Sequence, residues 1–193
     1  MVPNAVMPER STVLAPSESK RRGVLDERFT ALFRAEYGYV WGTLRRLGVS
    51  ARDAEDVAHE VFLRIYDKLE DFDPSRPAKP WFFSFVYRSA CDYRKLARHR
   101  VEVMQDHDVP SEVRSAEQSL ESADDATLVR EALDCIEFDR RTVLVAFEMD
   151  EVPMKTIAEA TGVPLFTAYS RLRLAREDFR AAVERLSKKR GLS

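Results

Sequence analysis

The segment from residue 54 to residue 69 carries the apolar pattern that most constrains the fold of this chain. Its apolar residues recur at i, i+3, i+4 and i+7 without a break, which is the repeat of a helix with one buried face. The repeat consists of Ala54, Val57, Ala58, Val61, Phe62, Ile65, Tyr66 and Leu69. Other helices must cover such a face. The chain has 6 glycines in 193 residues, which also argues against an all-β fold with many tight turns.

Helical spacing also marks the segments on either side of this repeat. Residues 29–47 keep the spacing, Gly48 is the expected C-terminal end of that helix, and Ser50 with Asp53 fits a capping box before the next one. The stretch 72–80 contains three prolines and is predicted to be non-helical, so the following helix is expected from about Trp81 to His99.

The charge distribution divides the chain more clearly than its net charge of −2. Residues 81–100 contain five basic and one acidic side chain, residues 101–125 one basic and eight acidic, and residues 166–190 eight basic and three acidic. Two basic segments separated by an acidic one suit two nucleic-acid contacts joined by a linker. For any one segment, a solvated face is the simpler interpretation.

These patterns predict an all-α fold of two small helical domains joined by a flexible acidic linker. The expected divisions are an N-terminal flexible arm (1–24), a first domain (25–100), the acidic linker (101–125), a second domain (126–188) and a tail (189–193).

Residues 157–168 have the spacing of a helix-turn-helix. Ala158 supplies the small residue where two helices cross, Gly162 tolerates a positive φ in the turn, and Pro164 suits the first turn of the second helix. The expected buried stripe is Ala168, Leu172, Ala175, Phe179 and Ala182, and the exposed face is Phe166, Tyr169, Ser170 and Arg173, flanked by Arg171 and Arg176. A plain helical hairpin is the alternative, but the basic, hydroxyl-bearing face favours a reader of the DNA major groove.

An aromatic cluster occupies the start of the helix expected after the prolines. Its members are Trp81, Phe82, Phe83, Phe85, Tyr87 and Tyr93, interleaved with Arg88, Arg94, Lys95 and Arg98. Because one helix face cannot bury all six rings, some should meet solvent or a ligand. Rings beside basic residues can stack single-stranded bases. We expect Phe82 and Phe85 to be core, while the two interpretations are even for Trp81 and Tyr87.

Several classes of function find no support in the sequence. The three histidines lack metal-ligand spacing, and no phosphate-binding loop or nucleophile motif occurs, so we expect no enzyme, metal or cofactor. Cys91 and Cys135 form no CxxC pair, which fits a reduced cytoplasmic compartment. No run of 18 apolar residues could insert in a membrane, and a secretory signal is not expected.

Three segments, in order, resemble regions of the extracytoplasmic function group of sigma factors, the smallest relatives of bacterial sigma-70. Residues 53–64 are similar to region 2.2 of that family, Trp81-Phe82-Phe83 followed by Asp92 resembles regions 2.3–2.4, and residues 157–172 resemble region 4.2. The resemblance covers about residues 26–188 and includes both domains in the family's order.

The resemblance implies core RNA polymerase as the obligate partner, bound at its β′ clamp. The residues implied in that contact are Asp56, His59, Glu60, Leu63 and Arg64. An exposed Leu63 among charges independently hints at a protein partner, although a solvated face is the default for that helix. A separate anti-sigma protein is the family's usual control.

Promoter DNA is the second implied partner, with the first domain melting the −10 element and the second reading the −35 element. The implied −10 residues are Arg76, Lys79, Trp81, Tyr87, Arg88, Arg94, Lys95 and Arg98. The implied −35 residues are Lys155, Thr156, Phe166, Thr167, Tyr169, Ser170, Arg171, Arg173 and Arg176. A free-standing helix-turn-helix regulator is the main alternative, and a pure interaction protein without promoter contact is another.

Overall fold

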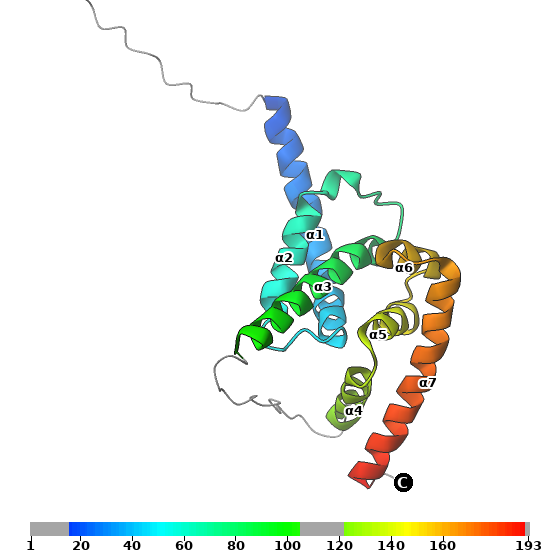
Figure 1. The fold of residues 1–193 in the computed structure, drawn as a ribbon. Coiled ribbons are helices and arrows are strands. Elements are labelled where there is room, and N and C mark those ends of the chain that lie inside the picture. Colours follow the sequence, from blue (N-terminus) through cyan, green and yellow to red (C-terminus); the bar gives the residue numbers. More distant parts are fainter. Residues whose placement is uncertain (1–15, 105–121, 192–193) are drawn as a thin grey trace, which may run out of the picture.

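The computed structural model describes residues 16–104 and 122–191, and all regular secondary structure in those ranges is helical (Figure 1). The expected all-α fold is confirmed. The N-terminal half (16–104) contains α1 (Pro16–Arg46), α2 (Ala54–Tyr66), the 3-10 turn η1 (Leu69–Asp71) and α3 (Ala78–Met104). The C-terminal half (122–191) contains α4 (Ser122–Asp134), α5 (Phe138–Leu144), the π-helical turn η2 (Val145–Met149), α6 (Met154–Thr161) and α7 (Leu165–Arg190).

Aromatic rings from all three helices fill the core of the N-terminal half. Phe62 of α2 lies at the centre, with its ring centroid 4.6 Å from that of Phe33 on α1 and 6.0 Å from that of Phe82 on α3. Phe29 and Tyr66 extend the cluster edge to face, at 5.0 Å. These tilted and edge-on arrangements are the ones that aromatic quadrupoles favour. The apolar repeat of α2 therefore finds its partners on α1 and α3.

Glycines end two of the helices where the sequence predicts it. Gly48 has φ +93°, its N–H donates to the carbonyl of Arg45 at 3.1 Å, and the N–H of Val49 donates to that of Leu44 at 3.0 Å. This pair of bonds is a Schellman motif, which satisfies the last carbonyls of α1. Gly162 ends α6 with φ +71°, as the helix-turn-helix requires.

The turn before α2 contains half of the predicted capping box, because the N–H of Asp53 donates to Ser50 Oγ at 3.1 Å. The other half is different. Tyr93 Oη, on α3, donates to Asp53 Oδ2 at 2.7 Å and accepts from the N–H of Ser50 at 3.4 Å. The hydroxyl of Tyr93 thus completes the cap and ties α3 to the start of α2.

Several predicted boundaries are wrong, because apolar periodicity does not detect the polar ends of helices. Part of the expected arm, 16–24, is helical, since no proline interrupts residues 17–73. Residues 78–80 are helical because Pro80 falls in the first turn of α3, where an N–H has no intrahelical partner. Both ends of the expected linker, 101–104 and 122–125, are helical, and its centre lies outside the described residues. Residues 189 and 190 of the expected tail belong to α7, and the helix expected over 54–69 ends at Tyr66.

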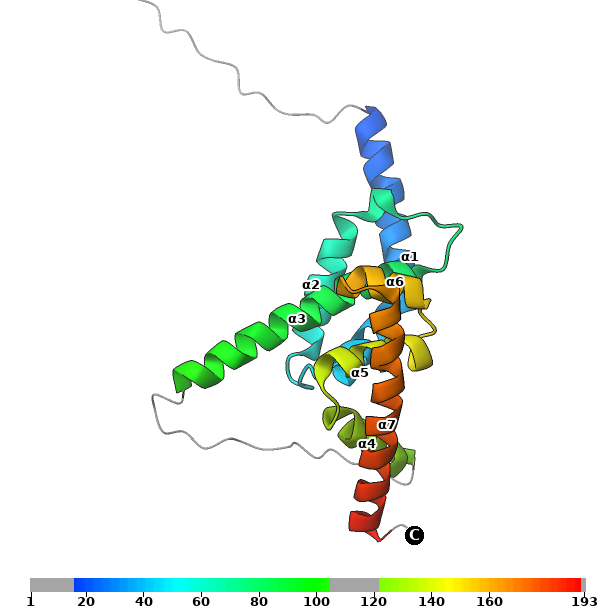
Figure 2. The ribbon, with the colours of Figure 1, turned by 45° about the vertical axis from the view of Figure 1, so that its right-hand side comes forward.

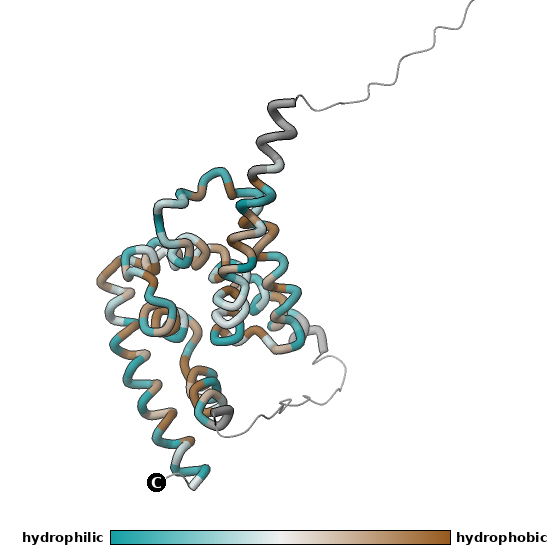
Figure 3. Tube along the Cα trace, turned by 180° about the vertical axis from the view of Figure 1, so that it is seen from behind, coloured by the Kyte–Doolittle hydropathy of each residue, from teal (hydrophilic) through white to brown (hydrophobic). Residues whose placement is uncertain are grey.

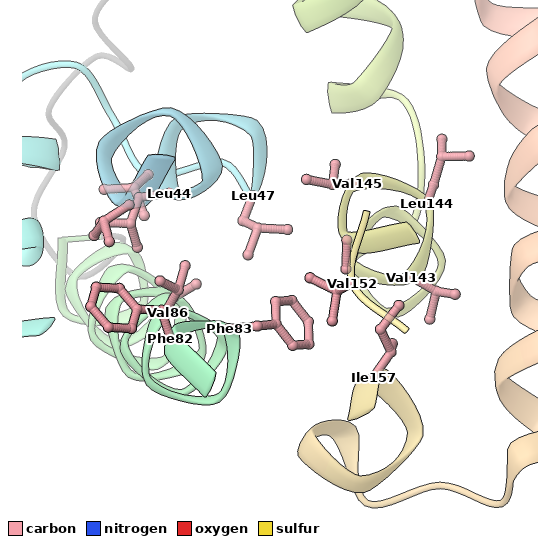
Figure 4. Close-up of a cluster of buried hydrophobic side chains, with 14 of the residues drawn as sticks. Leu44, Leu47, Phe82, Phe83, Val86, Val143, Leu144, Val145, Val152 and Ile157 are labelled. Atoms are coloured by element: carbon pink, nitrogen blue, oxygen red, sulfur yellow. The ribbon is translucent and has the colours of Figure 1, made fainter. Parts of the chain in front are cut away.

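The two halves pack against each other, and their buried side chains join one apolar cluster. Figure 4 shows Phe83 pointing from α3 toward Val152 and Ile157 of the C-terminal half, while Phe82 points into the N-terminal half. Both rings are fully buried. In Figures 1 and 2, α6 meets the start of α3 from either direction of view, and α7 lies on the outside of the second half. The core is seen again in Figure 3, where hydrophobic positions gather between neighbouring helices.

A buried polar contact joins the halves beside this core. Asp150, which follows η2 and is 2% exposed, accepts from Thr43 Oγ1 at 2.8 Å and from Arg46 Nη2 at 2.5 Å. Burial raises the pKa of the Asp150 carboxyl above its ordinary value, against the opposing effects of the Arg46 charge and the Thr43 hydrogen bond. Removing Arg46 would leave the buried Asp150 carboxylate without its charged partner.

Candidate nucleic-acid interface

The polar face of α2 carries the residues expected to contact the polymerase. Asp56, His59, Glu60 and Leu63 are exposed, and Leu63 is 66% accessible although it is apolar. Arg64 differs from these four, because its guanidinium donates to Ser89 Oγ and to Asp92 Oδ2 of α3, each at 3.2 Å. Four of the five residues therefore form one open face, and the fifth joins that face to α3.

The rings of α3 are divided between the two cores and the surface. Phe82 and Phe83 are buried on different sides of the helix, whereas Phe85 is only partly buried, so the expectation that it is a core residue holds only in part. Trp81 is partly exposed and packs against Phe72 and Phe85, with ring centroids 5.0 and 4.9 Å away. Aromatic residues occur on all sides of α3 because the N-terminal half packs on one side of this helix and the C-terminal half packs on the other.

A cleft of about 550 Å³ lies where α3 meets α6. Its walls include three of the predicted −10 residues, Arg76, Trp81 and Arg88, together with Thr156 and Glu159 of α6. Of the remaining −10 set, Lys79 stands over the ring of Tyr39 at 5.7 Å, and Lys95 and Arg98 are exposed farther along α3. The structure thus brings one subset of the predicted residues together at the cleft.

Tyr87 and Arg94 are covered by the C-terminal half. The ring of Phe138, the first residue of α5, is stacked on Tyr87 with centroids 6.2 Å apart and planes inclined by 16°. The guanidinium carbon of Arg94 lies 3.8 Å from the centre of the same ring. Burial is the main cause that raises the pKa of Tyr87 to about 12. No local pattern in the sequence predicts Phe138 as a contact of this site, because the contact joins residues about fifty positions apart.

The start of α7 is the most exposed apolar surface of the C-terminal half. Phe166 is 82% and Tyr169 51% accessible, and Arg173 is exposed beside them, while Thr167 and Ser170 are partly buried. The predicted buried stripe is present, with Ala168, Leu172, Ala175 and Ala182 buried and Phe179 partly so. The predicted rotation of the helix is therefore correct for the buried stripe and for Phe166, Tyr169 and Arg173. Ser170, which was expected on the exposed face, is only partly exposed.

The arginines of α7 have different partners. Arg173 pairs with Glu177 of the same helix at 2.7 Å and remains exposed. Arg171 pairs with Asp139 of α5 at 2.7 Å and is three-quarters buried, and Arg176 pairs with Glu148 of η2. Ahead of the turn, Lys155 is exposed and Thr156 lines the cleft. Of these three arginines, Arg173 is thus the one whose ion pair stays within α7.

Comparison with known proteins agrees with this arrangement. Residues 32–100 match the family model of sigma-70 region 2. The chain is 29% identical over 161 residues to the ECF RNA polymerase sigma factor SigL of Mycobacterium tuberculosis, covering 81% of this chain and 91% of the relative. It is also 29% identical over 164 residues to the ECF sigma factor RpoE of Cereibacter sphaeroides, covering 82% and 90% of the two chains.

Two solved structures share the fold. A sigma factor RpoE, in complex with the anti-sigma factor NepR from Bartonella quintana, has a TM-score of 0.68 at 18% identity, covering 82% of this chain and 98% of that one. CnrH, in complex with the cytosolic domain of CnrY, has a TM-score of 0.57 at 21% identity, covering 82% and 89%.

Residues 32–100 are thus a sigma-70 region 2 by their match to the family model. Over about four fifths of its length, the chain is similar to RNA polymerase sigma factors of the extracytoplasmic function group. A free-standing helix-turn-helix regulator is not favoured, because it would leave the matched residues 32–100 without a role. In the described ranges, no helix is long and apolar enough to cross a membrane, and no group of three or more potential metal ligands occurs.

Proposed function

We propose that the chain binds core RNA polymerase and directs it to promoters, opening the −10 element with its N-terminal half and reading the −35 element with α7. The observation that carries this proposal is the match of residues 32–100 to sigma-70 region 2, which contains both the open face of α2 and the aromatic, basic part of α3. The chain itself catalyses no reaction in this proposal, and it acts in the cytoplasm, where the polymerase and the genome are.

The polymerase contact is the face of Asp56, His59, Glu60 and Leu63. An apolar side chain surrounded by charged ones has the composition of a small interface centre with a polar rim. Arg64 contributes by holding α2 against α3 through Asp92. This arrangement links polymerase binding to the placement of the DNA-binding helix.

Melted −10 DNA is assigned to the cleft and to the exposed side of α3. Trp81 offers a partly exposed ring, and Arg76 and Arg88 line the same cleft. Rings beside arginines hold unpaired bases through stacking and the backbone through charge. Lys79, Lys95 and Arg98 add positive charge along the path. Tyr87 and Arg94 belong to the same surface once Phe138 no longer covers them.

The −35 element is assigned to the start of α7. Tyr169, Ser170 and Arg173 would face base edges, and the exposed ring of Phe166 would contact a thymine methyl group. Lys155, Thr156, Thr167, Arg171 and Arg176 would hold the phosphates on either side. A separate anti-sigma protein is proposed as a further partner, since two relatives of the same fold were solved with such proteins.

The test is transcription from fragmented genomic DNA by core polymerase with and without the purified chain. The expected result is a set of new transcripts whose mapped 5′ ends share two upstream sequence elements. A chain that binds specific duplex DNA equally well without polymerase, and adds no transcripts with it, would instead be a free-standing regulator.

A further inference from the structure

The ring of Phe138 contacts two of the predicted −10 residues on α3. It is nearly parallel to the ring of Tyr87, with centroids 6.2 Å apart, and the guanidinium carbon of Arg94 lies 3.8 Å from its centre. Proteins that bind single strands hold bases in this way, with an aromatic side chain on one face and an arginine nearby. Both α3 residues belong to the predicted −10 set, and Phe138 belongs to the other half of the chain.

The local structure keeps this ring in place. The side chain of Glu137 caps α5 by accepting from the N–H groups of Asp139 at 3.0 Å and Arg140 at 3.3 Å, which fixes Phe138 at the first position of the helix. The carboxylate of Asp139 then pairs with Arg171 of α7. The ring that covers α3 and an arginine of the recognition helix are thus held by the same turn of α5.

Two further contacts close the halves over the site. Phe83, Val152 and Ile157 form the apolar part of the contact, and Asp150 with Thr43 and Arg46 forms the polar part. Phe138 cannot leave Tyr87 and Arg94 without some separation of the C-terminal half from α3. In the parent chain, access of a DNA strand to Tyr87 and Arg94 therefore requires that the halves separate.

We propose that Phe138 is an internal substitute for a nucleobase, which blocks the Tyr87–Arg94 site until the two halves separate. The inference rests on the proposed function, because it takes Tyr87 and Arg94 as contacts of the melted strand. Free chain should then bind single strands weakly, while chain opened by core polymerase has the site available. This device would keep the unassembled factor from occupying DNA.

The test measures the affinity of the free chain for a fluorescein-labelled single-stranded 20-mer of random sequence, by anisotropy at low salt. Phe138→Ala should bind at least about fivefold more tightly than the parent, because stacking on one aromatic ring contributes about 1–3 kcal/mol per base. Phe179→Ala is the matched control, because it removes a partly buried ring of α7 that lines a pocket with Leu133 and Leu144 of the C-terminal half. A similar gain in the control would overturn the proposal, since general loosening would then explain the result.

A second variant opens the halves while leaving Phe138 intact. Asp150→Arg places a positive charge against Arg46 in a buried site, so the halves should separate, and the affinity for the 20-mer should rise as it does for Phe138→Ala. Circular dichroism and thermal unfolding check that both variants remain folded. Parental affinity in both folded variants contradicts the proposal, and if Phe138→Ala fails to fold, Asp150→Arg decides alone.

The same variants, assembled with core polymerase, separate this inference from the proposed function. Parent and Phe138→Ala holoenzymes should bind the 20-mer equally, because polymerase has already opened the chain. Suppose that Tyr87→Ala impairs promoter opening but Phe138→Ala leaves the affinity of the free chain for the 20-mer unchanged. The proposal that Phe138 substitutes for a base is then wrong, while the proposed role of the chain at promoters is supported. If no holoenzyme initiates at promoters, the proposed function itself fails.

Discussion

The guanidinium of Arg64 on α2 lies 3.2 Å from the carboxylate of Asp92 on α3, and both side chains are about half accessible. This ion pair joins the helix with the open face to the helix with the aromatic and basic residues. The resemblance to sigma factors implies Arg64 as a polymerase contact, and the sequence alone indicates no partner for Asp92. The structure indicates that Arg64 positions α3, which a double-mutant cycle can separate from direct contact.

We expect Arg64→Ala and Asp92→Ala to be coupled by about 0.5–1 kcal/mol in the free energy of unfolding, because partly exposed ion pairs contribute little more than that. Urea unfolding of the two single variants and the double variant measures this coupling. Polymerase affinity should change little on Arg64→Ala once Asp92 is already alanine. A further large loss in that background would show that Arg64 contacts the polymerase directly.

Leu63→Glu should weaken binding to core polymerase by about tenfold or more, because burying a leucine at an interface contributes about 1.5–3 kcal/mol. Its effect on the free energy of unfolding should stay within about 0.5 kcal/mol, since the side chain is exposed in the free chain. Leu96→Glu is the matched control, being the same change at a 60% accessible leucine on α3. Equal losses for the two variants would remove α2 from the interface.

Arg173→Ala should lose about 1–3 kcal/mol of affinity for the cognate −35 sequence and relax specificity at one position, because Arg173 is exposed beside Tyr169. Arg176→Ala should weaken binding to all sequences alike and lower the salt dependence by about one unit. Binding of both variants to single-base −35 mutants at several salt concentrations distinguishes these roles. A uniform loss for Arg173→Ala would shift base contact to Arg171.

Asp150→Asn should reveal the contribution of the buried carboxyl to the pH dependence of stability. Burial raises the pKa of Asp150 in the folded chain, so the folded state holds this proton more firmly than the unfolded state does. The carboxyl's contribution to the free energy of unfolding therefore falls as pH rises from about 4, the ordinary aspartate value, through the raised pKa. The charges of Arg46 and Lys79 oppose this rise in the pKa of Asp150. Tyr39 stays neutral in this range, because burial raises its pKa above the ordinary tyrosine value.

The measurement is the free energy of unfolding of Asp150→Asn minus that of the parent, from urea curves at several pH values. This difference should increase with pH above about 4 and become constant once the carboxyl is fully ionised. A difference that decreases over that range would mean that the pair with Arg46 outweighs the effect of burial.

The elements of this fold were largely predictable because each helix carries its own pattern. The repeat of α2, the glycines at 48 and 162 and the buried stripe of α7 are local signals, and the structure contains all of them. The burial of Phe83 had no such signal, because Val152 and Ile157 cover it from about seventy residues away. The repeat of apolar residues within one helix shows that one face of the helix is apolar. The repeat does not show which other segment of the chain covers that face.

The same limit applies to the candidate site. Exposure of Leu63, Phe166 and Tyr169 followed from helix rotation alone and is confirmed. The contact of Phe138 with Tyr87, and the burial of Asp150, depend on how the halves meet. Asp150 follows an apolar segment, as aspartates in ordinary surface turns often do. Only the fold therefore identifies its partners on α1, Thr43 and Arg46.

The apolar contact between the halves also makes their closure depend on temperature. Exposing Phe83, Val152 and Ile157 to water when the halves part adds a positive heat-capacity change to the opening. The hydrophobic part of the closing free energy therefore weakens on cooling. Cooling would thus lower the apolar contribution that Phe83, Val152 and Ile157 make to closure of the two halves.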